Sequence, residues 1–166
     1  FLASQTAIIL EAKTTNSYRL TLKGENTFTG ADEWLEVIGT NANFKVVKED
    51  AKLDMTKTSG LVAFEGNNYY NTLAYAVKDA AANVTVLKAH EITKTAVVEK
   101  DMTIDFADLA ITGNVYPVVR IQKGANVTAM NGNINNNDYV FVLGSSDKTT
   151  AGNLTINGGT YVGATS

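Results

Sequence analysis

A short triplet recurs through the second half of the chain and constrains its fold more than any other feature. The triplet is Asn or Asp, then an apolar residue, then Thr. It occurs four times, at Asn83-Val84-Thr85, Asp101-Met102-Thr103, Asn126-Val127-Thr128 and Asn153-Leu154-Thr155. The last two copies are followed by Asn131-Gly132 and Asn157-Gly158-Gly159, which are typical of tight turns. A helix-free repeat of about 20 to 27 residues predicts coils of a parallel β-helix.

The repeat also gives a structural reason for the abundance of asparagine. Charged residues make up only 19% of the 166 residues, and 17 Asn and 21 Thr supply much of the remaining polarity. Asn side chains at equivalent turns, such as Asn126 and Asn153, can stack from coil to coil and hydrogen-bond along the stack. The triplets at Asn83, Asn126 and Asn153 could also accept a glycan in a eukaryotic secretory pathway, but coil packing explains them more simply.

The sequence predicts a single helix, over residues 71–82. Apolar residues fall at i, i+3, i+4, i+7 and i+8, namely at Leu73, Ala76, Val77, Ala80 and Ala81. Asn71 or Thr72 is placed to accept the free N–H groups of the first turn. We expect this helix to cover an end of the solenoid, with Leu73, Ala76 and Val77 as structural residues.

Residues 1–60 predict short strands separated by polar turns. The expected strands are residues 7–10, 18–22, 34–38 and 44–47. In the second of them Tyr18, Leu20 and Leu22 alternate with polar residues, which predicts one half-buried face. The fold class is therefore all-β. We expect a short β-rich N-terminal domain over residues 1–60, and a capping helix followed by parallel β-helix coils over residues 61–166.

Two segments resemble a known family. Residues 62–77 (VAFEGNNYYNTLAYAV), followed by Val84-Thr85-Val86-Leu87 and Met102-Thr103-Ile104-Asp105, resemble the start of right-handed β-helix domains of the pectate-lyase-like superfamily. In that superfamily a similar helix covers the open end of the solenoid. Residues 152–161 (GNLTINGGTY) are similar to coil repeats of large bacterial surface proteins and phage fibres. The chain departs from the family at residues 105–108, where a glycine-rich turn is usual.

The first functional hypothesis is a non-catalytic building block of an exterior surface. The resemblance implies a bacterial cell-surface adhesin, or a virion fibre or decoration component, located outside the cell or on the virion, and no cofactor is expected. About four coils would leave an open edge at the C-terminal end, and open strand edges pair with further strands. We therefore expect other subunits as partners, in a homo-oligomer, or a chain that continues beyond Ser166.

The alternative is a polysaccharide lyase or hydrolase. The resemblance implies it, because enzymes of this fold cleave acidic polysaccharides with clustered aspartates, a calcium ion and an arginine or lysine base. The best available residues are Asp101, Asp105, Asp108, Arg120 and Lys123. Turn and solvent-facing roles explain these carboxylates more simply, because a calcium site needs six to eight oxygen ligands.

A third hypothesis is a glycan-binding module. Exposed aromatic rings stack on sugars, and the candidates are Trp34, Tyr116, Tyr139 and Tyr161. His90 is the only histidine, so no two-histidine metal site can form. We expect it to be a solvated residue in a loop between strands.

Composition argues against other partners. The net charge is −3, and Lys and Arg are scattered along the chain, so nucleic-acid binding is not expected. No apolar stretch approaches the roughly 18 residues of a membrane span. Cysteine is absent, which excludes disulfides and thiolate metal sites.

Overall fold

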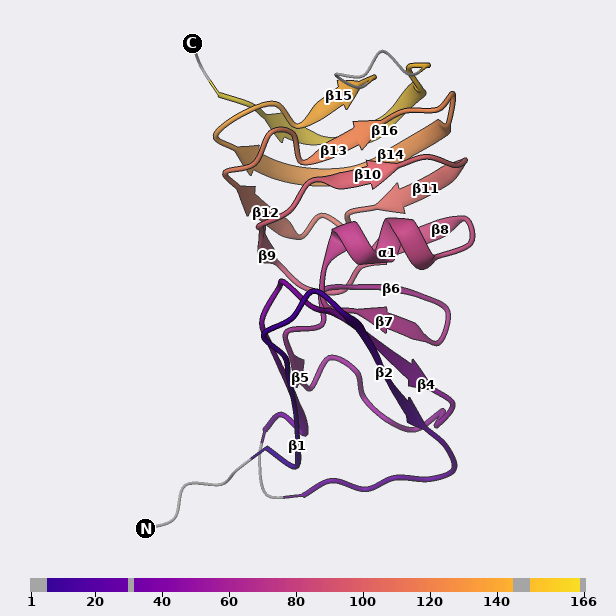
Figure 1. Ribbon diagram of the computed structural model, residues 1–166, viewed down its shortest axis with the longest axis vertical. Coiled ribbons are helices and arrows are strands. Elements are labelled where there is room, and N and C mark those ends of the chain that lie inside the picture. The colour runs from indigo at the N-terminus through magenta and orange to yellow at the C-terminus, as the bar shows by residue number, and fades with distance from the viewer. Residues whose placement is uncertain (1–5, 30–31, 145–149, 165–166) are drawn as a thin grey trace.

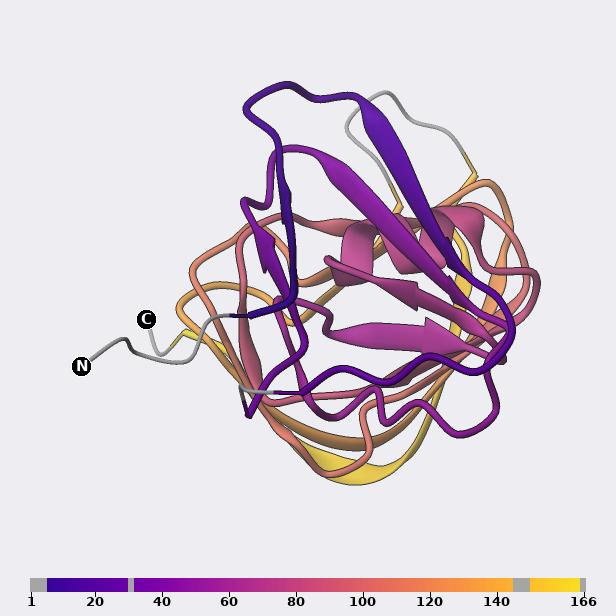
Figure 2. The same cartoon turned by 90° about the horizontal axis from the view of Figure 1, so that it is seen from below.

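The computed structural model describes residues 6–29, 32–144 and 150–164. It is an all-β solenoid of about six turns with one helix, so the predicted fold class is confirmed. The chain climbs along the long axis of the molecule, from the N-terminal strands at one end to the C-terminal coils at the other (Figure 1). Viewed along that axis, the C-terminal coils follow one another around a shared interior (Figure 2).

Three parallel ladders build the C-terminal coils. The first contains β8 (Asn83–Val86), β11 (Met102–Asp105) and the first halves of β14 (Asn126–Asn136) and β16 (Asn153–Val162). The second contains β9 (His90–Ile92), β12 (Ala110–Gly113) and the second halves of β14 and β16. The third contains β10 (Ala96–Val98), β13 (Val119–Ile121) and β15 (Phe141–Leu143). Alternate residues point inward, and Val84, Ile104, Ile111 and Ile121 are each at most 1% exposed.

The register of the coils agrees with three of the four triplets. Met102 pairs with Val127, and Val127 pairs with Leu154, so the triplets at Asp101, Asn126 and Asn153 are aligned. Asn83 pairs with Thr103 instead of Asp101, which corrects the predicted alignment by two residues. A shift of two residues leaves every side chain on the same face of the strand, so the pattern of buried residues does not reveal it.

Parallel coiling also occurs in the N-terminal part of the chain, where no triplet predicts it. The strands are β1 (Ile8–Glu11), β2 (Ser17–Leu22), β3 (Leu35–Ile38), β4 (Asn43–Lys48) and β5 (Thr58–Ser59). β1, β3 and β5 form one parallel ladder, and β2 and β4 form another. The predicted strands are present. Parallel coils are therefore not confined to the segment after the helix, where we expect them, because β1 and β3 are already paired in parallel, with Ile8 opposite Leu35.

An antiparallel hairpin joins the two parts. It consists of β6 (Ala63–Glu65) and β7 (Asn68–Tyr70), with β7 beside β4 and β6 beside β8. The buried apolar residues form two clusters, one between Leu22 and Leu61 and the other between Val62 and Val140. The hairpin is therefore the place where both the strand direction and the core change.

Helix α1 (Leu73–Asp79) is shorter than the predicted range of 71–82. Thr72 caps its N-terminus, because the backbone N–H of Tyr75 donates to Thr72 Oγ1 (3.0 Å). Beyond its C-terminus, the Glu65 carboxylate accepts hydrogen bonds from the backbone N–H groups of Ala81, Ala82 and Asn83, at 2.7–3.0 Å. These bonds hold the chain in a non-helical path, so the helical stripe ends before Ala81.

The buried face of α1 lies against the first strand of the third ladder. Leu73, Ala76, Val77 and Ala80 are at most 2% exposed, and the helix contacts β10 as well as β6, β7 and β8. The helix covers that end of the third ladder, while β2 and β4 continue the stack on its other side (Figure 1). It therefore lies within the solenoid and not at its terminus.

The turn at residues 105–108 is built without glycine. Ala107 and Asp108 both have positive φ angles, of 55° and 57°. Asp105 Oδ1 accepts hydrogen bonds from the backbone N–H of Ala107 (2.8 Å) and from Asn131 Nδ2 (3.0 Å). These side-chain hydrogen bonds hold a corner that glycine usually provides.

Candidate functional site

Two of the predicted sugar-binding aromatics are not free surface rings. Trp34 is 6% exposed, stacks on Phe28 at 4.9 Å between ring centroids, and donates from Nε1 to the Asp54 carbonyl (3.0 Å). This corrects the prediction for Trp34, which is a core residue. Tyr161 is half-buried over the interior of the last coil, where its ring contacts those of Phe106 and Phe141.

The other two predicted aromatics form an exposed pair. Tyr116 and Tyr139 are 60% and 59% exposed, and their ring centroids lie 5.5 Å apart at 67°. The guanidinium group of Arg120 lies 5.7 Å from the Tyr116 ring centroid, and Nη1 donates to the Gly144 carbonyl (3.0 Å). The fold brings these rings together from two loops, one before β13 and one before β15.

Asn136 holds these two loops together. It is 1% exposed, and its Nδ2 donates to the carbonyls of Val115 (2.8 Å) and Tyr139 (2.9 Å). The first carbonyl belongs to the residue before Tyr116, and the second belongs to Tyr139 itself. Sequence reasoning missed this residue, although the signal was present: Asn136 lies two positions after the apolar Ile134, and a strand places such residues on the same face.

The aligned triplets carry a polar ladder. Asn153 Nδ2 donates to Asn126 Oδ1 (3.0 Å), and Asn126 Nδ2 donates to Asp101 Oδ1 (3.0 Å). The backbone N–H of Asn126 also donates to Asp101 Oδ1 (2.8 Å). These hydrogen bonds, first from the backbone and then from the side chain of Asn126, hold the pKa of Asp101 below its ordinary value.

The carboxylates considered for catalysis make turn contacts. Asp101 accepts from Asn126, and Asp105 accepts from Ala107 and Asn131. Lys123 donates to Glu99 (2.6 Å). Within the described ranges, no contact joins Asp101, Asp105 or Asp108 to Arg120 or Lys123, and no group of three His, Asp or Glu side chains could hold a metal ion.

His90 is not a solvated loop residue, which corrects the prediction. It begins strand β9, pairs with the buried Ile111, and alternates with the exposed Glu91 and the buried Ile92, so its ring faces the interior. Nδ1 donates to the Lys88 carbonyl (2.7 Å), while Nε2 is buried without a hydrogen-bond partner in the described part of the chain. Burial lowers the pKa of His90, and the hydrogen bond with Lys88 only partly offsets this.

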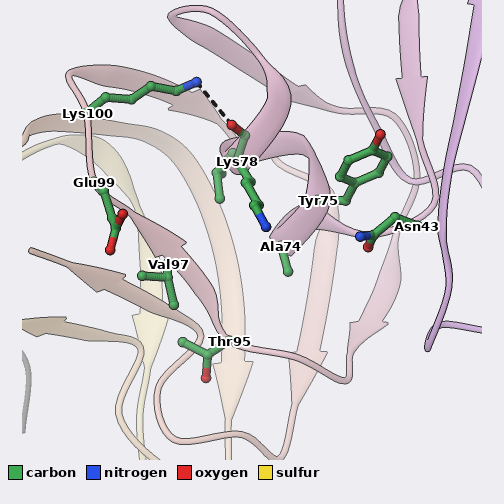
Figure 3. A pocket seen from close by; sticks show the side chains of 9 residues that line it. Asn43, Ala74, Tyr75, Lys78, Thr95, Val97, Glu99 and Lys100 are labelled. Atoms are coloured by element: carbon green, nitrogen blue, oxygen red, sulfur yellow. Dashed lines mark hydrogen bonds between the residues drawn. The ribbon is translucent and has the colours of Figure 1, made fainter. Parts of the chain in front are cut away.

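A groove of about 660 Å³ runs between α1, β10 and β4 (Figure 3). Val77 and Val97 belong to its apolar part, and Asn43 and Tyr75 supply polar groups. Lys78 and Lys100 also line it, and Lys100 Nζ donates to the Lys78 carbonyl (3.2 Å). Sequence reasoning missed this groove, because it forms only when the helix packs on a strand that follows much later in the chain.

The last coil leaves an open end. Ile156 pairs with Ala129 and Leu143 pairs with Ile121, and both partners are fully buried. Ile156 and Leu143 occupy the same inward columns but are 51% and 47% exposed. In the described residues, no strand pairs with the second edge of β16.

The described helix is too short and too polar to cross a membrane. Comparisons of the chain with protein-family models, with curated proteins and with solved structures found no match.

Proposed function

We propose that this chain is a non-catalytic structural and adhesive component of an exterior surface, either a bacterial cell-surface adhesin or a virion fibre or decoration protein. In this proposal its coils stack onto further strands at β16, supplied by other subunits. The observation that carries the proposal is the exposure of Ile156 in a column whose preceding member, Ala129, is fully buried. An apolar side chain that points toward the solenoid interior but is half-exposed favours a further coil, which would stack on β16 and cover it.

The edge of β16 is suited to parallel pairing. It pairs with β14 over nine positions on one side, while its other edge has no partner in the described chain. Unpaired edge strands are templates for another strand. Asn153 uses its Nδ2 in the ladder, and its Oδ1 makes no hydrogen bond within the described residues. A strand carrying Asn at the equivalent position would extend the ladder by one rung.

The test is self-association measured by analytical ultracentrifugation over a range of protein concentrations. Ile156→Lys places a charge in the apolar end, where burial against a further layer is costly, so we expect it to weaken assembly. Ile38→Lys is the matched control, because Ile38 is 39% exposed at the end of β3 and away from β16. A wild-type protein that stays monomeric, or that assembles equally well with Ile156→Lys, would contradict the proposal.

Glycan binding is the second candidate function, and the exposed Tyr116–Tyr139 pair favours it. Two adjacent rings beside Arg120 provide both a stacking surface and a cation. We expect Tyr139→Ala to reduce glycan binding on an array, whereas Tyr18→Ala should not, since Tyr18 is exposed on β2, outside this pair. Equal binding by both variants would remove this candidate.

A further inference from the structure

We propose that the groove between α1 and β10 binds an acidic oligosaccharide, which continues across Arg120 to the Tyr116–Tyr139 pair. This inference rests on the glycan-binding candidate, and it adds the surface and the chemical class of the sugar. It is independent of strand addition at β16, because none of the groove residues belongs to that strand.

The groove has the size and mixed lining of a small-ligand site. Its volume of about 660 Å³ lies within the roughly 300–1,000 Å³ of such sites. Val97, on the outward face of β10, is 38% exposed and gives an apolar surface on which the C–H face of a sugar ring can rest. Asn43 and Thr95 supply groups that can hydrogen-bond to hydroxyls.

The charges in the groove favour an acidic ligand. The Lys78 ammonium has no partner in the described chain, and Figure 3 shows its side chain extending over the groove. Lys100 donates one hydrogen bond to the Lys78 carbonyl, which leaves two of its three N–H donors. The nearby Glu99 carboxylate already accepts from Gln122 and Lys123, both at 2.6 Å. Lys78 is thus available to a carboxylate on the ligand, and Lys100, whose charge also lowers the pKa of Glu65 and Asp79, supplies a second cation.

The outer surface next to the groove leads toward the tyrosine pair. Val97 pairs with Arg120 in the β10–β13 ladder, and both lie between inward-facing neighbours, so both project outward. Thr95, which lines the groove, donates from Oγ1 to the Pro117 carbonyl (2.7 Å) next to Tyr116. A ligand that leaves the groove over Val97 therefore meets Arg120 and then the Tyr116 ring. The cations along this path are Lys78, Lys100 and Arg120, and the one carboxylate among the groove residues is Glu99.

A sugar suits this surface better than an acidic peptide. Extended peptides add to open strand edges through backbone hydrogen bonds. Here β10 pairs only with β13, and helix α1 packs against it, so a peptide strand would have to displace the helix to pair with β10. Recognition must come from side-chain polar groups and a flat apolar floor, which match ring hydroxyls and ring C–H faces.

The experiment is calorimetric titration of the full chain with a hyaluronan hexasaccharide, which alternates carboxylate-bearing and neutral rings. A carboxyl-reduced hexasaccharide and a glutamate hexapeptide are titrated in parallel. The variants are Lys78→Gln and Lys100→Gln, with Lys13→Gln as the control, because Lys13 is exposed and outside the groove. Thermal melting of each variant checks that it is folded.

We expect saturable binding of the acidic hexasaccharide, about tenfold weaker for each groove variant and unchanged for Lys13→Gln. Added NaCl should weaken it further. Equal binding of the carboxyl-reduced sugar would overturn the acidic class while leaving glycan binding intact. Equal binding of the peptide would overturn the saccharide class. Absence of binding to every probe, or equal affinity of all variants, would overturn the groove as the site.

Discussion

Lys45 of β4 and Asp79 of α1 form an ion pair across the junction between the N-terminal strands and the helix, with 2.7 Å between Nζ and Oδ2. The same oxygen accepts a hydrogen bond from the Tyr70 hydroxyl (2.7 Å). Burial raises the pKa of Asp79, but Lys45 and Tyr70 together lower it by more, so it lies below its ordinary value. The two side chains are only 19% and 31% exposed, so solvent screens the pair less than it would an ordinary surface pair.

We therefore expect Asp79→Asn to destabilise the protein by about 1–3 kcal/mol at pH 7, because it removes the charge that both Lys45 and Tyr70 contact. The measurement is urea unfolding. Glu25→Gln is the matched control, since it breaks the Lys52–Glu25 pair, whose side chains are 75% and 76% exposed. Exposed pairs contribute about 0–1 kcal/mol. Equal losses for the two variants would show that the junction pair has no special role.

The second prediction concerns stability below neutral pH. The pKa of His90 is lower in the folded protein than its ordinary value of 6.5, because burial disfavours the charged ring. The unfolded chain therefore takes up a proton first, and stability that is complete above pH 6.5 is lost as the pH falls through and below that value. Each pKa unit of lowering is worth about 1.4 kcal/mol.

Melting temperatures at pH 7.5, 6.5 and 5.5 test this prediction. The wild type should lose stability across the series, and His90→Gln should lose less, because glutamine does not titrate. Carboxyl groups with lowered pKa values, such as Asp101, change the folding stability only near pH 4 and below. Their effect should be the same in the wild type and in His90→Gln. Parallel curves for wild type and variant would mean that His90 is solvated enough to titrate normally.

The third prediction compares two adjacent glycines in β16. Gly158 and Gly159 both have positive φ angles, of 75° and 114°, so alanine strains the backbone at either site. A Cβ on Gly158 would meet no atom within 4 Å, whereas a Cβ on Gly159 would overlap the backbone of Gly132 in the coil below. We expect Gly159→Ala to separate β16 from β14, and Gly158→Ala to leave the pairing intact.

Amide hydrogen exchange in β16 gives the readout. Exchange should accelerate in Gly159→Ala for the amides that pair with β14, and much less in Gly158→Ala. Similar protection in both variants would indicate that the last coil adapts to the added methyl group.

Local patterns in the sequence predicted the parts of the fold that depend on local order. The 3.6-residue spacing identified Leu73, Ala76 and Val77 as the buried face of the helix, and the repeated triplets aligned Asn126 with Asn153. These features depend on neighbours within a few residues or on the coil repeat itself. The N-terminal coils were not predicted from the sequence, because their paired residues, such as Ile8 and Leu35, do not belong to any repeated triplet.

Features set by distant contacts were not predictable in this way. The helix ends before Ala81 because Glu65, 16 residues earlier in the chain, accepts hydrogen bonds from the backbone there. Trp34 is in the core because Phe28 stacks on it and the Asp54 carbonyl accepts from its ring. The groove needs Lys78 and Lys100 to approach one another from a helix and a later turn. In each case the residue type was visible in the sequence, but its partner was not.

The last prediction tests whether the helix is an integral layer of the solenoid. Leu73 is 2% exposed and belongs to the cluster that fills the C-terminal coils. Leu73→Ala should cost about 2–5 kcal/mol, because it removes buried methyl groups and leaves a cavity. Leu73→Asp should cost more, since it also buries an unpaired charge. Lys78→Ala on the exposed side of the same helix should change stability by about 0.5 kcal/mol or less. Urea unfolding separates these cases, and a Leu73→Asp protein as stable as Lys78→Ala would show that the helix is peripheral to the stack.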